Sequence, residues 1–169
     1  MYKIFLINSF RKFFMKEYFK DIFEYEQWAN NEFINIIESM KSPPDSILNL
    51  MSHIINARII WLGRIKKINF NTEVWQKYKK DDLRNIHSSS VNSVLKFISE
   101  NTEEDFEKII EYENSKGEKF SSRLSDILIH LSHHSAYHRG QLVIHLKSVN
   151  SVLPDTDYIL YVKNFKKIN

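Results

Sequence analysis

The sequence predicts an all-α protein, and specifically a four-helix bundle. Its 169 residues are 43% hydrophobic, which is enough to close one sizeable core without disulfides. Glycine and proline number only three each, which leaves little turn material for a many-stranded sandwich or barrel. Apolar residues also recur at helical spacing in four segments, three of them long enough for helices of about 27 to 39 Å. Together these observations favour a few long helices.

The first two predicted helices meet at a proline pair. In residues 18–40, apolar positions recur at steps of three, four and seven, which places them on one face of a helix. Pro43 and Pro44 end that helix, and because proline suits a first helical turn, the same pair can open the second helix at 45–66. The apolar faces comprise Phe19, Ile22, Ala29, Phe33, Ile36 and Met40 in the first helix, and Ile47, Leu50, Ile54, Ala57, Ile60, Trp61 and Ile65 in the second.

A long polar crossover separates the second helix from the third. We expect residues 67–82 to run over the surface, with Phe70, Trp75 and Tyr78 as isolated aromatics, and the third helix to span 83–100. A crossover of this length can carry the chain back along the bundle, so that the second and third helices run parallel.

The rest of the chain is predicted to form a small hairpin or flap at 106–123, a last long helix and a terminal strap. The helix begins at 122 or 124 and continues to 149, and its apolar stripe steps alternately four and three residues, which is the spacing of a bundle seam. Residues 158–165 are expected to pack back on the bundle as a short helix or strap. The predicted stripe comprises Leu124, Leu128, Leu131, Ser135, His138, Leu142, His145 and Val149.

Charge and composition exclude several classes of function. The formal charge of +3 comes from 24 basic and 21 acidic residues, and the basic residues occur as scattered pairs, so we expect a solvated surface and no nucleic-acid binding. No segment approaches a membrane span or a secretory signal, which favours a cytoplasmic protein without a membrane partner. Because the chain has no cysteine, any metal must be held by nitrogen and oxygen, and any thiol chemistry needs an external thiol.

Five of the seven histidines fall in the last long helix. At about 100° per residue, His138 lies in the middle of the apolar stripe, His134 lies beside it one turn earlier, and His130 lies at the edge of the stripe. His133 falls on the solvent side. The helix therefore separates its own histidines into an inner and an outer set.

Two imidazoles at positions i and i+4 on one helix face can bind a single cation. His53, on the edge of the buried face of the second helix, is the natural third ligand beside His134 and His138. The alternative from the pattern alone is that His53 and His138 are hydrogen-bonded core histidines and His134 is a partly exposed flanking residue.

Other chemistries have less support. The zinc-protease signature is missing because Ser135 stands where its glutamate should be. Glu26 falls in the apolar stripe of the first helix, and we expect it at the surface with its stem covering the core edge, a buried carboxylate near the metal being the alternative. Arg139 and Gln141 are candidates for supporting His138, although we favour exposed positions on the helix surface.

Three sequence elements together resemble a known family. They are Tyr25 to Asn30 in the first helix, His53 in a helix that ends near Trp61-Leu62, and the last-helix motif in which His134 is followed by His138-Arg139-Gly140-Gln141. In these elements the chain resembles the DinB/YfiT-like family of metal-dependent enzymes over roughly residues 15–165.

The resemblance implies up-down-down-up connectivity, in agreement with the long crossover, and a divalent metal, often nickel or zinc, on three histidines. Carried over position by position, these are His53, His134 and His138. Some relatives transfer low-molecular-weight thiols, while many have no assigned reaction. The family's usual start corresponds to residue 15, so we expect a single domain over 15–169 and an N-terminal extension over 1–14.

We therefore hypothesise a metal-dependent enzyme that activates a low-molecular-weight thiol, as a thiol transferase, or water, as a hydrolase. A small-molecule substrate is expected near Trp28 and Tyr137, and Gly140 would permit close helix approach in a homodimer. The first alternative is a metal- or ligand-binding stress protein without turnover. The second is a structural bundle whose buried histidines are only hydrogen-bonded.

Overall fold

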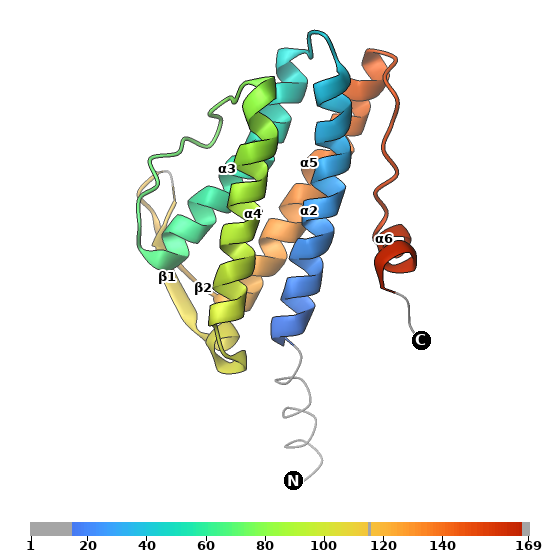
Figure 1. Cartoon of the computed structure of the whole chain (residues 1–169). Helices are drawn as coiled ribbons and strands as arrows, with labels where there is room; N and C mark the ends of the chain where they lie inside the picture. The colour runs from blue at the N-terminus through green and yellow to red at the C-terminus, as the bar shows by residue number, and fades with distance from the viewer. Residues whose placement is uncertain (1–14, 115, 167–169) are drawn as a thin grey trace.

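The computed structural model of the chain describes residues 15–114 and 116–166, and it is mostly helical with a small two-stranded sheet (Figure 1). The predicted extension over 1–14 lies outside the described residues. Two short 3-10 turns precede α4 and β1. The elements are α2 (Met15–Ser39), α3 (Asp45–Lys66), α4 (Leu83–Glu100), β1 (Ile109–Glu113), β2 (Lys119–Arg123), α5 (Leu124–Ser148) and α6 (Tyr158–Phe165).

The four long helices α2 to α5 lie lengthwise beside one another (Figure 1). In that view α2 ascends and α3 descends, the segment after α3 returns to the top, α4 descends and α5 ascends, so α3 and α4 run in the same direction. The most extensive packing joins α2 to α4 and α3 to α5. The facing surfaces of α3 and α5 are the ones that carry the candidate metal ligands.

Two apolar clusters fill the space between the long helices. One cluster lies toward the α2–α3 connection, and the other lies toward the start of α2 and the sheet. The larger buried members of the first are Phe33, Ile34, Ile37, Ile47, Met51, Ile55 and Leu142, and those of the second are Phe19, Phe23, Leu62, Ile98, Phe106, Leu124 and Leu128.

The predicted hairpin is present as β1 and β2, which pair antiparallel with Tyr112 opposite Phe120. A 3-10 turn before the hairpin is capped by two reciprocal hydrogen bonds. The Thr102 hydroxyl accepts from the backbone N–H of Asp105, and the Asp105 carboxylate accepts from the backbone N–H of Thr102. The Trp61 ring of α3 packs edge-on against Tyr112, with 4.8 Å between the ring centroids. The sheet therefore covers the C-terminal end of α3.

The apolar stripe predicted for the last helix is wrong at its C-terminal end. Leu146 is the buried residue there, whereas His145 is half-buried and Val149 is 43% exposed. An α-helix has 3.6 residues per turn, so a strict repeat of seven residues drifts by about 20° per repeat and lies about 60° off the starting face at His145, three repeats after Leu124. At His138, two repeats after Leu124, the drift is only about 40°, and that residue is still buried.

The C-terminal strap ends in α6, which packs on α2 through aromatic side chains. Tyr161 is buried against Trp28, with 5.6 Å between ring centroids, and the Tyr25 hydroxyl donates to the backbone carbonyl of Thr156 at 2.8 Å. Among the described helices, none is long and apolar enough to cross a membrane.

Candidate metal centre

Three histidines from two helices meet between α3 and α5. His53 projects from α3, and His134 and His138 project from successive turns of α5. The Nε2 atom of His134 lies 3.1 Å from Nε2 of His53 and 3.2 Å from Nε2 of His138. One ligand atom from each of the three residues falls within 4.8 Å of the others. The structure thus brings together all three residues predicted from the sequence.

Two of these imidazoles are oriented by hydrogen bonds on their outer nitrogens. His53 Nδ1 lies 3.0 Å from the carbonyl oxygen of Val74, and His138 Nδ1 lies 2.8 Å from Oε1 of Gln141. Both partners are acceptors, so each Nδ1 carries the proton and each Nε2 presents a lone pair to the centre. This arrangement, with oxygen acceptors behind the rings, is the one found behind metal-bound histidines.

Burial favours the neutral form of two of the three ligands, His53 and His134. It lowers the pKa of His53 from its ordinary value, and the neighbouring His138 acts in the same direction. For His134, burial together with His138, His53 and His130 lowers the pKa to about 4. Neutral imidazole is the form that binds metals, so the lowered pKa values of His53 and His134 favour metal binding at these two ligands.

The donor set fits a borderline transition-metal ion. Three nitrogen donors suit zinc, nickel, copper or iron, whereas magnesium and calcium prefer oxygen ligands. Without an ion, two lone pairs are directed at His134 Nε2, which has at most one proton to donate. A cation at the centre would satisfy all three nitrogens, and three ligands would leave a coordination position open.

Exposed aromatic side chains flank the centre on both sides. The Trp75 indole stacks on the His53 ring at 3.9 Å between centroids and an angle of 11°, and is 59% exposed. Tyr137, which is 65% exposed, packs edge-on against His138 at 5.1 Å. Of the two residues expected near a substrate, Tyr137 lies beside the centre, whereas Trp28 packs against Tyr161 and Phe165 of α6.

The crossover after α3 is part of the centre and not a simple surface connection. Asn56 donates to the carbonyl oxygen of Gln76 at 2.8 Å, and the backbone N–H of Tyr78 donates to the Ser52 hydroxyl at 3.0 Å. Both α3 residues are fully buried. These bonds hold Val74 and Trp75 against His53. Sequence reasoning placed Trp75 on a polar surface segment and gave it no role, because nothing local in the sequence marks its stacking partner.

Glu26 forms a buried ion pair, so the surface position predicted from the sequence is wrong. It is 1% exposed, and Arg139 Nη1 donates to both of its carboxylate oxygens at 3.0 Å. The same nitrogen donates to the Ser135 hydroxyl at 2.9 Å, and the other terminal nitrogen donates to the Tyr25 hydroxyl at 3.1 Å. The surface position expected for Arg139 is also wrong, because its side chain is buried as the partner of Glu26. The pairing of the two charges is visible only in the folded structure.

A second buried polar group was missed by the sequence analysis. Arg58 is 2% exposed and donates to the Ser90 hydroxyl at 2.9 Å, and it contacts His87 Nδ1 at 3.3 Å. Burial and the charge of Arg58 lower the pKa of His87 to about 3. In the sequence, the only sign of this buried group was His87, which falls in the otherwise apolar stripe of the third helix.

The remaining α5 histidines near the centre lie where the helical angles place them. His133 is exposed on the solvent side. His130 is exposed at the edge of the stripe, with its ring 5.5 Å from that of His134 and 5.5 Å from that of Trp61. Burial lowers the pKa of His130, which belongs to the wall of the centre and not to the group of three ligands.

Comparison with known proteins places these features in a family. A sequence model described as the DinB family matches residues 15–165. "Protein DinB" of Bacillus subtilis (strain 168) is 22% identical over 169 aligned positions, which cover 88% of this chain and 95% of that protein. The crystal structure of a DinB-like protein from Bacillus cereus ATCC 10987 superimposes with a TM-score of 0.66 at 18% identity, over 82% of this chain and 95% of the other. The chain belongs to the DinB family.

Proposed function

We propose that this protein is a metal-dependent enzyme whose site is formed by His53, His134 and His138 and holds one divalent ion, zinc or nickel. The observation that supports this most strongly is the convergence of three imidazole nitrogens within 4.8 Å, two of them on rings whose outer nitrogens face oxygen acceptors. An ion bound there by neutral ligands would keep its charge and an open position, at which the pKa of water or a thiol falls.

The residues around the centre divide the remaining tasks. Val74 and Gln141 fix the tautomers of His53 and His138, and the Trp75 and Tyr137 rings bound the space in front of them. Such flanking aromatics suit a small organic substrate with an apolar part. We propose a low-molecular-weight thiol as the activated group, with transfer to an electrophilic small molecule, or activation of water for hydrolysis.

The primary test is metal content by mass spectrometry on untagged protein, with the His134→Ala and His133→Ala variants. The two histidines are neighbours on α5, but only His134 points into the centre, so His133→Ala is a matched control. We expect about one ion per chain in the wild type and His133→Ala, and loss in His134→Ala. Metal-free protein after incubation with zinc and nickel, or full metal content in His134→Ala, would overturn the proposal.

Thiol transfer is tested by following consumption of external thiols with a panel of electrophiles. Because the chain has no cysteine, every thiol detected belongs to the added reagent. Metal-dependent consumption that is lost in His134→Ala would support a transferase. The second candidate function, a metal- or ligand-binding stress protein without turnover, would be supported by tight metal binding with no thiol-dependent or hydrolytic reaction.

The finer architecture belongs to the same proposal. The packing of α2 on α4 and α3 on α5 supports a four-helix bundle with up-down-down-up connectivity. Gly140 is exposed and, apart from the adjacent backbone of α5, no described residue would lie within 4 Å of a Cβ there. A homodimer with Gly140 at its interface remains part of the proposal, and light scattering would test it. We also propose a cytoplasmic protein with one domain over 15–169 and an extension over 1–14.

A further inference from the structure

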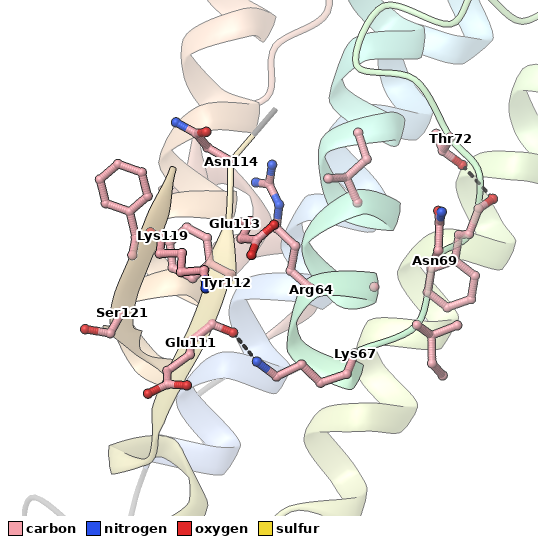
Figure 2. Close-up of a pocket in the computed structure, with 15 residues that line it drawn as sticks. Arg64, Lys67, Asn69, Thr72, Glu111, Tyr112, Glu113, Asn114, Lys119 and Ser121 are labelled. Carbon is pink, nitrogen blue, oxygen red and sulfur yellow. Dashed lines mark hydrogen bonds between the residues drawn. The ribbon is translucent and has the colours of Figure 1, made fainter. Parts of the chain in front are cut away.

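A cavity of about 1100 Å³ lies apart from the three histidine ligands, between the C-terminal end of α3, the segment that follows it and the β1–β2 sheet (Figure 2). Cavities that bind small molecules are typically about 300 to 1000 Å³. The volume is thus ample for a small organic molecule. None of the described histidines lines it.

Gly63 allows the segment after α3 to fold close against that helix and form one wall of the cavity. The backbone N–H of Ile68 donates to the Gly63 carbonyl at 2.9 Å, and Lys67 adopts a left-handed conformation with φ 56°. A Cβ on Gly63 would lie 2.6 Å from the Ile68 carbonyl oxygen and 3.0 Å from the Phe70 ring. The glycine therefore allows the chain to turn back tightly against α3 and set Phe70 at the cavity.

Arg64, one of the three basic residues that line this cavity, is held by aromatic rings and not by a carboxylate of the described residues. The Arg64 guanidinium carbon lies 4.7 Å from the Trp61 ring centroid and 5.8 Å from that of Tyr112. Over residues 15–114 and 116–166, Arg64 has no hydrogen bond or ion pair with another side chain. Stacking orients the planar group but leaves its N–H donors available.

The other charges at the cavity do not compensate Arg64. The lining carries three basic residues against two acidic ones, Glu111 and Glu113, and Glu113 lies opposite Lys119 in the sheet register. The Lys67 ammonium donates to the backbone carbonyl of Glu111, a neutral acceptor (Figure 2). The formal charge of the lining is therefore +1, and Arg64 has no carboxylate partner among the described residues. Phe70, Tyr112 and Phe120 supply apolar surface.

We propose that this cavity is a second ligand site, which binds a small molecule with a carboxylate or phosphate group on an aromatic body. The Arg64 fork matches two oxygens of either group, and the aromatic body would pack on Phe70 and Tyr112. The site does not depend on the proposed metal centre, since its lining shares no residue with the three histidine ligands.

The test is calorimetric titration of the metal-free full-length chain with 2-naphthoate and 1-naphthyl phosphate, each compared with the neutral 2-naphthamide. We expect one anion to bind at about one per chain and the amide to bind at least about ten-fold more weakly, because a hydrogen-bonded charge is lost. The tighter of the two anions identifies the group that the site prefers. His134→Ala should bind the anion as the wild type does, even if the metal proposal fails.

Variants on α3 separate a built site from general attraction of anions. Arg64→Gln should weaken anion binding about ten-fold or more, and Arg64→Lys should retain part of it. Lys66→Gln removes the same charge from an exposed residue whose ammonium lies over Phe97 of α4, outside the cavity, and should leave affinity unchanged. Failure of both anions to bind, equal binding of the amide, or equal losses in Arg64→Gln and Lys66→Gln would each overturn the proposal. Circular dichroism confirms that the variants are folded.

Discussion

Arg139 and Glu26 form a buried ion pair in which one guanidinium nitrogen lies 3.0 Å from each carboxylate oxygen. Arg139 directly follows His138 on α5, and Glu26 lies on α2, so the pair fixes the rotation of α5 relative to its neighbours. That rotation is what directs His134 and His138 toward α3. The pair therefore connects the core of the protein to the candidate metal centre.

Glu26→Gln should destabilise the fold strongly. The substitution keeps the shape of the side chain but leaves the buried Arg139 charge without a carboxylate, a change that costs about 3 to 5 kcal/mol. Urea unfolding measures this. Glu100→Gln is the control, because among the described residues Glu100 forms an exposed ion pair with Lys96, and its loss should change stability by at most about 0.5 kcal/mol. Similar losses in the two variants would contradict the assignment.

Gln141→Leu should weaken metal binding without unfolding the protein. The substitution removes the acceptor for His138 Nδ1, and loss of such a partner typically lowers metal affinity about 10- to 100-fold. Competition with a fluorescent zinc chelator measures the affinity. Gln141→Glu keeps an acceptor at the same place and should bind zinc at least as tightly as the wild type. Wild-type affinity in Gln141→Leu would show that the hydrogen bond does not support the centre.

Trp75→Ala should weaken metal binding about three- to ten-fold, because the stacked indole holds the His53 ring in place. Trp75→Phe retains a stacked ring and should recover most of the affinity in the same chelator competition. Binding of nickel should also change the tryptophan fluorescence of the wild type more than that of Trp75→Phe. If Trp75→Ala binds zinc as tightly as the wild type, the indole has no role in positioning His53.

Stability should fall as the pH drops below about 6.5 in metal-free protein. The pKa of His87 is lowered to about 3 in the folded state from an ordinary value of 6.5, so between these values the unfolded chain binds a proton that the folded chain does not. Above pH 6.5, His87 causes no change of stability with pH. Between pH 6.5 and pH 3 it lowers the free energy of unfolding as the pH falls, by at most about 1.4 kcal/mol per pH unit. Urea unfolding at pH 7 and pH 5 measures the difference. His87→Gln should show a smaller pH dependence, and an unchanged one would assign the effect to other groups.

The sequence by itself determined the helices, the short sheet and the three candidate ligands. Helical periodicity is a local property, so the spacing of His134 and His138 already places both on one face of α5, and the apolar neighbours of His53 already place it near the buried face of α3. The three prolines and Gly117 lie in connections for the same local reason. At the end of α5, Leu146 is buried in place of His145. A strict seven-residue repeat therefore does not predict burial over the whole length of the helix.

Only the tertiary structure decided which polar residues have partners. Glu26 and Arg139 are 113 residues apart, and a charge in an apolar stripe has the same sequence signature whether it is paired inside or extended along the surface. Trp75 likewise lies in a polar segment, and its place on His53 depends on bonds from Ser52 and Asn56 to the crossover. Burial of a charge or a ring depends on what faces it in space, and distant pairings of this kind have no period in the sequence.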